Sequence, residues 1–278
     1  MKNPARMIAL FTVSLVVISL PQLEAGAEER ANRLIPLLEA GKPVVGVWTG
    51  ALAAPRIAKV LATSDADYIV ADVEHDIYDF NALHRFLLEV QDFSNRFRTT
   101  PRAAPIVLVK LANRGMWDPR YEIAESLKVG PAMGVWVPMV ESRADLERAI
   151  SAVRGAETSA MAGLNIPSER RDVWPLNPKG ELLVVAMIET EGGVRNAQEI
   201  VETPGVSAIE TVHIPEADAA RILKMCKGRG VIAAIDASPA DVKAKLDAGY
   251  KMVSVGWDFG LLQRSLSDTV KAFRSAIK

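Results

Sequence analysis

The feature that most constrains the fold is an alternation of short apolar runs with longer amphipathic stretches. Eight runs rich in β-branched or other apolar residues follow one another along the chain. Such runs are typical of strands in a buried parallel sheet, and the charged stretches between them have helical spacing. The predicted strands are Pro43 to Trp48, Asp67 to Val73, Pro105 to Leu111, Gly134 to Pro138, Leu182 to Ile188, Val206 to Val212, Val231 to Ile235 and Met252 to Val255.

Eight strand-helix repeats in roughly 250 residues have the size and order of a (β/α)8 TIM barrel. The alternative is a doubly wound open sheet, but no strand is followed by G-x-G-x-x-G or G-x-x-x-x-G-K-[ST], the phosphate loops of its nucleotide-binding versions. We therefore predict an α/β protein with a single TIM-barrel domain. The predicted helices are Arg30 to Ala40, Asn81 to Phe93, Asp118 to Leu127, Ser142 to Val153, Gly193 to Val201, Ala217 to Lys227, Pro239 to Ala248 and Leu261 to Ile277.

The N-terminal segment has the pattern of a secretory signal peptide. Lys2 and Arg6 precede an apolar run of about 14 residues, shorter than the roughly 20 that span a bilayer. Ala25 to Ala27 supplies the small residues of a cleavage site. We predict a signal peptide at residues 1–27 and a barrel domain at 28–278. We also predict that the protein is exported to the periplasm. The alternatives are a retained N-terminal anchor and a buried first helix.

Charge and cysteine content exclude two further classes of protein. The net charge is −1, and it stays near neutral without residues 1–27. The chain therefore lacks the excess of basic residues that is typical of nucleic-acid-binding proteins. The single cysteine, Cys226, cannot form an intramolecular disulfide. It lies in a helical pattern, where a small buried residue is favoured over a nucleophile. Stability must then come from core burial.

Polar residues at the carboxyl ends of barrel strands are the first candidates for chemistry. The second strand leads into Asp72 and His75, and a carboxylate at this spacing can orient an imidazole that takes a proton. The fifth leads into Glu189, a possible ligand for a hard divalent cation. Alternatively, Asp72 caps a loop beside a solvated histidine, and Glu189 belongs to the start of the next helix.

Three further features bear on the site. Lys110, at the end of the third strand, offers a positive charge that could stabilise an enolate, unless it is an ordinary surface lysine. Trp48, Trp136 and Trp257 lie at or near strand ends and pack there or shape a pocket. The longest irregular segment, Arg154 to Gly180, is predicted to be a functional loop that crosses to the next strand.

Several of these segments together resemble the HpcH/HpaI aldolase and citrate lyase family. The similarity covers roughly residues 35–276, and the E-H and I-E-T strand ends together are its most specific part. The segments that carry it are Asp72 to His75, Val137 to Val140, Met187 to Thr190, Pro204 to Val206 and Val255 to Gly256, with Asp172 to Pro178 and Ile222 to Lys227 similar to one branch of the family.

The resemblance implies a TIM-barrel enzyme, often a hexamer, that makes or breaks carbon–carbon bonds next to a 2-oxo acid. In such enzymes pyruvate chelates Mg2+, Mn2+ or Co2+, and the ion stabilises its enolate. Carried over by position, His75 is the acid-base residue, Asp72 its orienter and Glu189 a metal ligand. Lys110 stands where the family usually has an arginine, which keeps the charge and loses the bidentate geometry.

The chain departs from the family after the sixth strand. The loop that normally carries a second metal carboxylate is missing, and Asp218 falls in the first turn of the next helix instead. Glu210 lies in an otherwise apolar strand, where an acidic residue is costly unless it is paired or coordinated. One hypothesis is that Glu210 or His213 completes a rearranged metal site. The alternative is a strand-end carboxylate that the shortened loop leaves exposed.

Two functions therefore remain open on the sequence. The first is a divalent-metal-dependent lyase acting on a 2-oxo or 4-hydroxy-2-oxo acid, with His75 moving the proton, Glu189 and Glu210 holding the metal and Lys110 countering enolate charge. The second is an exported barrel that has lost efficient metal binding and serves as a small-acid binding protein. The residues Asp72, His75 and Glu189 favour the first, and the missing loop favours the second.

Overall fold

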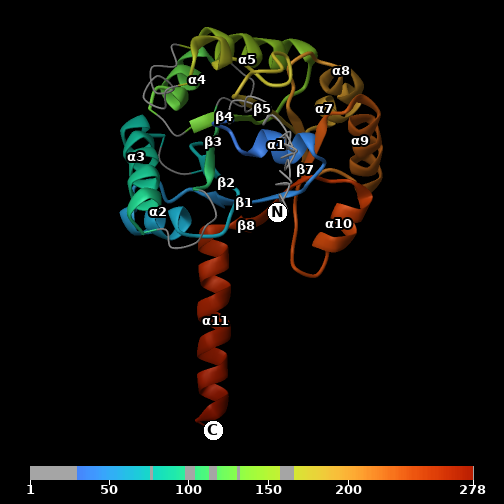
Figure 1. Ribbon diagram of the computed structural model, residues 1–278. Helices are drawn as coiled ribbons and strands as arrows, with labels where there is room; N and C mark the ends of the chain where they lie inside the picture. The colour runs from blue at the N-terminus through green and yellow to red at the C-terminus, as the bar shows by residue number, and fades with distance from the viewer. Residues whose placement is uncertain are drawn as a thin grey trace, which may run out of the picture.

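The structure is a computed structural model that describes residues 30–75, 78–97, 104–112, 118–129, 132–156 and 166–277. Its parallel strands close into one barrel in the order β1 to β8; the helices from α2 to α10 lie around it, and the last helix, α11, projects away from it (Figure 1). The predicted TIM barrel is confirmed and the open sheet is wrong. The predicted signal peptide, residues 1–27, lies outside the described residues. None of the described helices has the length and apolar character needed to cross a membrane.

The elements follow the predicted order with small shifts at their ends. The strands are β1 (Val44–Thr49), β2 (Tyr68–Asp72), β3 (Ile106–Lys110), β4 (Ala132–Val137), β5 (Leu183–Ile188), β6 (Ala208–Thr211), β7 (Ile232–Asp236) and β8 (Met252–Trp257). The helices are α1 (Leu34–Glu39), α2 (Pro55–Ala62), α3 (Phe80–Phe97), α4 (Arg120–Leu127), α5 (Arg143–Gly155), α7 (Glu191–Arg195), α8 (Ala197–Val201), α9 (Glu216–Arg229), α10 (Val242–Ala248) and α11 (Asp258–Ala276), with a 3-10 turn, η1, at Ser168–Arg170.

Two helices differ from the sequence prediction. The segment Gly193 to Val201 was expected to be one helix, but Asn196 leaves helical geometry and separates α7 from α8. Helix α2 was not among the predicted elements. It starts at Pro55, a residue whose fixed φ suits the first turn of a helix.

Aromatic side chains of β2 and β4 stack on each other among the buried residues of the barrel. Every residue of β2, β3, β4 and β5 is buried, as expected for a parallel sheet covered on both faces. The ring of Tyr68 stacks on Trp136 at 6.1 Å between centroids. A Cβ at Gly46 would lie 2.1 Å from the Tyr68 ring, so only glycine leaves room for this packing.

The described part of the irregular segment before β5, residues 166–180, lies at the opposite end of the barrel from the strands' carboxyl ends. In its described part, Arg170 forms a buried ion pair with Glu181, and the same carboxylate accepts the backbone N–H of Asn32 at 2.9 Å. Glu181 lies two residues before Leu183, the first residue of β5. These contacts hold residues 166–180 near the amino end of β5, away from the cavity at the carboxyl ends of the strands. The functional role of this loop stays a prediction; residues 157–165 lie outside the described part of the chain.

Candidate active site

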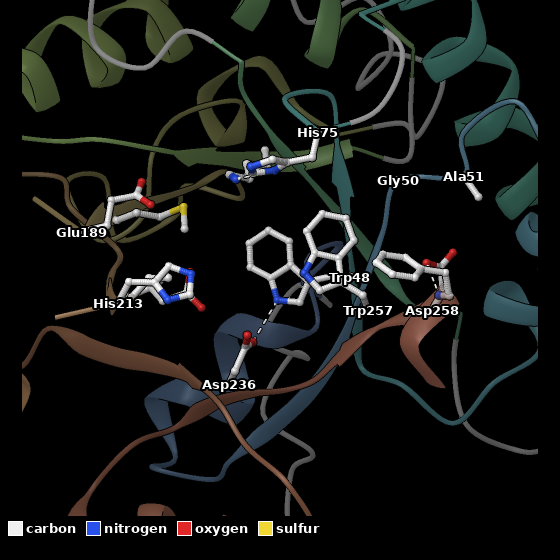
Figure 2. A pocket seen from close by; sticks show the side chains of 14 residues that line it. Trp48, Gly50, Ala51, His75, Glu189, His213, Asp236, Trp257 and Asp258 are labelled. Atoms are coloured by element: carbon white, nitrogen blue, oxygen red, sulfur yellow. Dashed lines mark hydrogen bonds between the residues drawn. The ribbon is translucent and has the colours of Figure 1, made fainter. Parts of the chain in front are cut away.

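A cavity of about 790 Å³ lies at the carboxyl ends of the strands. Its size suits a small molecule with room for a second reactant. Figure 2 shows an aromatic side built by Trp48 and Trp257 and polar side chains around it. The lining residues are Trp48, Gly50, Ala51, His75, Lys110, Met187, Glu189, Glu210, Val212, His213, Asp236, Trp257, Asp258 and Phe259.

The end of β2 brings Asp72 and His75 together as the sequence predicts. Asp72 is fully buried, and its Oδ1 accepts the backbone N–H groups of Glu74 at 2.6 Å and His75 at 2.9 Å. Its Oδ2 lies 2.9 Å from the imidazole Nδ1 of His75. The same residue thus turns the chain after the strand and holds the ring. The His75 side chain is 54% exposed at the cavity. It can therefore exchange a proton with a bound molecule while Asp72 holds the ring in place.

The surroundings of Nδ1 decide which nitrogen of His75 faces the cavity. Lys110 Nζ approaches Nδ1 to 3.2 Å, and Asp72 Oδ2 lies on the same nitrogen. Asp72 can only accept a hydrogen bond at Nδ1, and the Lys110 ammonium can only donate one. In the tautomer with the proton on Nδ1, that proton is donated to Asp72, and Nε2 is left to accept a proton from a ligand. The edge of the His75 ring packs against Trp257 at 5.9 Å between centroids.

Lys110 is buried, so the alternative of a surface lysine is wrong. Its Nζ lies 2.6 Å from a Glu74 carboxylate oxygen and 3.3 Å from Asp72 Oδ2. Two carboxylates therefore already share its charge. The arrangement makes Lys110 the cation that permits Asp72 and Glu74 to be buried side by side, and it leaves less charge for a bound anion than the sequence suggested.

Glu189 follows β5 and reaches the cavity. Its Oε1 accepts the backbone N–H of Met139 at 2.8 Å, and its other oxygen makes no hydrogen bond with a described residue. Thr190 is the N-cap of α7, since its Oγ1 accepts the N–H of Gly193 at 3.0 Å. The helix start therefore uses Thr190, and the carboxylate of Glu189 remains available to a ligand.

Glu210 is buried at the base of the cavity, so the alternative of an exposed strand-end carboxylate is wrong. Its Oε2 accepts the indole N–H of Trp136 at 2.9 Å. Burial, and next the negative charge of Asp236, raise the pKa of Glu210 to about 8. Without a bound ion, Glu210 is therefore mostly a neutral acid near pH 7, and one of its oxygens already accepts a hydrogen bond. Its metal role stays a prediction.

His213 follows β6 and lies on the same side of the cavity as Glu189 (Figure 2). The two come from neighbouring strands that pair Ile188 with Thr211, one and two residues before them. The His213 ring is hydrogen-bonded to no described residue. Its backbone φ is +53°, a conformation that only Met139 shares among the described non-glycine residues. Such strained positions cluster at functional sites.

Asp236 and Asp258 also line the cavity, although they were not among the predicted site residues. Asp236 Oδ1 accepts the indole N–H of Trp48 at 3.1 Å, and Asp258 Oδ2 accepts the hydroxyl of Thr49 at 2.7 Å. Both are polar residues at the carboxyl end of a barrel strand, like the predicted site residues: Asp236 ends β7, and Asp258 follows β8. They were missed because the two strands run one to two residues beyond the predicted ends.

The described residues contain no group of three or more His, Cys, Asp or Glu side chains arranged to hold a metal ion. The free carboxylate oxygen of Glu189 and the open imidazole of His213 are the donors that remain uncommitted on one side of the cavity. Asp72 uses both oxygens internally, and Asp236 holds Trp48 and Ser254. Both hydrogen bonds of Asp236 use Oδ1. A cation bound among these residues would need further ligands from its substrate and water.

The model of the HpcH/HpaI aldolase/citrate lyase family matches residues 45–219. A 4-hydroxy-2-oxo-heptane-1,7-dioate aldolase of Escherichia coli is 24% identical over 260 residues, which cover 84% of this chain and 92% of the relative. A hydroxypyruvate/pyruvate aldolase of Pseudomonas aeruginosa is 26% identical over 270 residues, covering 87% and 93%. The crystal structure of an HpcH/HpaI aldolase from Desulfitobacterium hafniense superposes with a TM-score of 0.71 at 20% identity, over 87% of this chain and 96% of that one.

Proposed function

Since the chain belongs to the HpcH/HpaI aldolase/citrate lyase family, we propose that it is a divalent-metal-dependent carbon–carbon lyase acting on a 2-oxo or 4-hydroxy-2-oxo acid. The observation that carries the proposal is that His75, oriented by a buried Asp72, lines the same cavity as Glu189, one of whose carboxylate oxygens remains available. A base and a ligand site that share one cavity can act on one bound molecule.

His75 is assigned the proton transfer. In cleavage of a 4-hydroxy-2-oxo acid, Nε2 accepts the proton of the 4-hydroxyl as the bond between carbons 3 and 4 breaks. The aldehyde leaves, and the proton returns to carbon 3 of the 2-oxo acid, so the imidazole ends as it began. Asp72 stabilises the imidazolium in between, since its Oδ2 lies 2.9 Å from Nδ1. Lys110 acts through Asp72 and Glu74, because its ion pairs permit the two carboxylates to lie buried side by side.

Glu189 and His213 are the residues that fit a divalent ion. A bound ion would act as a Lewis acid on the carboxylate and keto oxygens of a 2-oxo acid. Imidazole and carboxylate together suit Mn2+ and Co2+ better than Mg2+, which prefers oxygen ligands alone. Among the three ions that the family suggests, we therefore place Mg2+ last. Glu210 takes no part in this set, because it is buried and bonded to Trp136.

The relatives named as aldolases act on 4-hydroxy-2-oxo-heptane-1,7-dioate or on hydroxypyruvate and pyruvate. These names support a 2-oxo acid as the substrate class, and the cavity of about 790 Å³ leaves space for an aldehyde beside it. We expect the mature protein to release pyruvate from a 4-hydroxy-2-oxo acid in the presence of Mn2+ or Co2+, and to stop when the metal is chelated. Release that continues in excess chelator contradicts the metal-dependent proposal.

A second candidate is a small-acid binding protein without efficient catalysis. It is favoured by the absence, in the described residues, of a metal-holding group of three or more side chains. Calorimetric titration with Mn2+, with and without oxalate, separates the two. The lyase should bind Mn2+ more tightly when oxalate is present, and H213A should lose most of that gain. A protein that binds oxalate equally well with and without Mn2+, and releases no pyruvate, is the binding protein.

A further inference from the structure

One side of the cavity is a wall of aromatic rings. Trp48 and Trp257 are partners in the pairing of β1 with β8, and their rings stack at 5.8 Å between centroids with 24° between planes. The ring of Phe259 lies 5.9 Å from that of Trp257. All three side chains line the cavity. Figure 2 shows the two tryptophans on the side away from Glu189 and His213.

The wall is fixed from behind and faces the cavity in front. Trp48 is 3% exposed, and its indole N–H donates to Asp236 at 3.1 Å and to Ser254 at 3.0 Å. Trp257 lies on this fixed ring and is only partly buried, and Phe259 is 65% exposed. A rigid aromatic surface of this kind can stack a flat ring with little loss of conformational freedom.

The acid-base residue lies against the wall. The edge of the His75 ring contacts Trp257 at 5.9 Å between centroids and 84° between planes. In the proposed cleavage, His75 accepts the proton of the 4-hydroxyl, so carbon 4 lies beside its ring. The substituent on carbon 4, which leaves as the rest of the aldehyde, therefore lies on the aromatic side. The 2-oxo acid faces Glu189 and His213 on the other side.

The charges near the wall disfavour an anionic aldehyde. Asp236 and Asp258 line the cavity, one beside each tryptophan (Figure 2). Among the described lining residues there is no arginine, and the one lysine, Lys110, shares its charge with Asp72 and Glu74. A second carboxylate, such as the one in the name of the Escherichia coli relative's substrate, would meet two acids there. A neutral aldehyde avoids this repulsion.

We propose that the aldehyde partner is a neutral aromatic aldehyde whose ring stacks on Trp257. The inference rests on the proposed function and makes the substrate a 4-aryl-4-hydroxy-2-oxobutanoate. Its bond between carbons 3 and 4 breaks, the hydroxyl proton passes through His75 to carbon 3, and the products are an aryl aldehyde and pyruvate. Trp257 and Phe259 then determine specificity. Stacking should favour an aromatic over a saturated ring of equal size by about 2–10-fold.

Pyruvate release with Mn2+ tests the inference on three substrates: 4-hydroxy-2-oxo-4-phenylbutanoate, its 4-cyclohexyl analogue and 4-hydroxy-2-oxoheptane-1,7-dioate. We expect kcat/KM to be highest for the phenyl compound and lowest for the dioate. The phenyl-to-cyclohexyl ratio should fall about 2–10-fold in W257L, and this comparison cancels the intrinsic ease of each cleavage. F259L, which changes an exposed ring, gives the same comparison if W257L does not fold.

The matched control is F97L, because Phe97 is an exposed phenylalanine at the end of α3 and does not line the cavity. It should keep the ratio of the parent. Equal ratios in the parent, W257L and F259L overturn the inference, and so does a preference for the dioate. In both cases the release of pyruvate still supports the proposed reaction, so the two failures are distinguishable.

Saturation-transfer NMR tests the aromatic site without catalysis or metal. Benzyl alcohol, a neutral and unreactive relative of benzaldehyde, should receive saturation from the parent and from F97L but much less from W257L, and cyclohexylmethanol should receive less from the parent. Benzyl alcohol that binds W257L equally well overturns the inference. Stronger transfer to choline than to benzyl alcohol also overturns it, because the wall and its two acids would then bind a cation. If no substrate releases pyruvate, the proposed reaction fails, and benzyl alcohol alone decides whether the wall binds aromatic rings.

Discussion

Replacing Glu210 by glutamine should change how the stability of the protein depends on pH. The pKa of this carboxyl is raised from 4.5 to about 8, first by burial and next by the charge of Asp236. Between these two values the folded protein keeps a proton that the unfolded chain releases. Stability therefore falls as pH rises through this window, with a slope of at most about 1.4 kcal/mol per pH unit. Over the whole window the loss reaches about 5 kcal/mol.

The glutamine variant lacks this titration but keeps an oxygen that can accept the N–H of Trp136. We expect the unfolding free energy of E210Q, relative to the parent, to increase by several kcal/mol between pH 5 and pH 8 in urea titrations. E216Q, which removes an exposed carboxyl of α9, controls for the loss of one charge. Parallel curves for parent and E210Q would refute the assignment of a neutral buried acid. Weaker Mn2+ binding by E210Q would refute its exclusion from the metal site.

Three other outcomes follow from the same structure. H75N should lower kcat by about 10²–10⁴-fold, the usual contribution of a general base, while Mn2+ and oxalate still bind by calorimetry. A smaller loss would assign the proton transfer elsewhere. K110M should reduce the unfolding free energy by about 3–5 kcal/mol, because Asp72 and Glu74 lose their shared cation, and unchanged stability in urea would contradict that pairing. N-terminal sequencing of the protein from a periplasmic extract should begin at Glu28; a chain that still begins at Met1 would favour a retained anchor.

The barrel could be predicted because its strands are locally encoded. A strand buried on both faces needs a continuous apolar run. Each of the eight runs of this chain can be recognised from its own residues, without knowledge of the others. The ends of the runs are less well encoded. Strand β8 continues through Gly256 and Trp257, and β7 through Asp236, where neither glycine nor aspartate favours a strand. Two acidic residues of the site were missed for that reason.

The site could be predicted where its chemistry depends on neighbours in sequence. Asp72 and His75 are three residues apart at a strand end, so one turn brings them together. Lys110 and Glu210 depend on neighbours in space. The carboxylates that share the charge of Lys110, and the indole that holds Glu210, come from other strands. Which residues face each other across a barrel depends on the stagger of its strands, and this is set by closure of the whole sheet.

Helix α11 was likewise predictable as a local element, whereas its position in the molecule was not. Its periodicity predicts a helix with one apolar face over residues 261–277, and that helix is present. The pattern encodes the apolar face but not the direction in which the helix runs. Strand β8 ends at Trp257 and α11 begins at Asp258, so no loop residue remains to turn the helix back onto its own strand. The direction of α11 therefore depends on the length of this junction, which the helical periodicity does not encode.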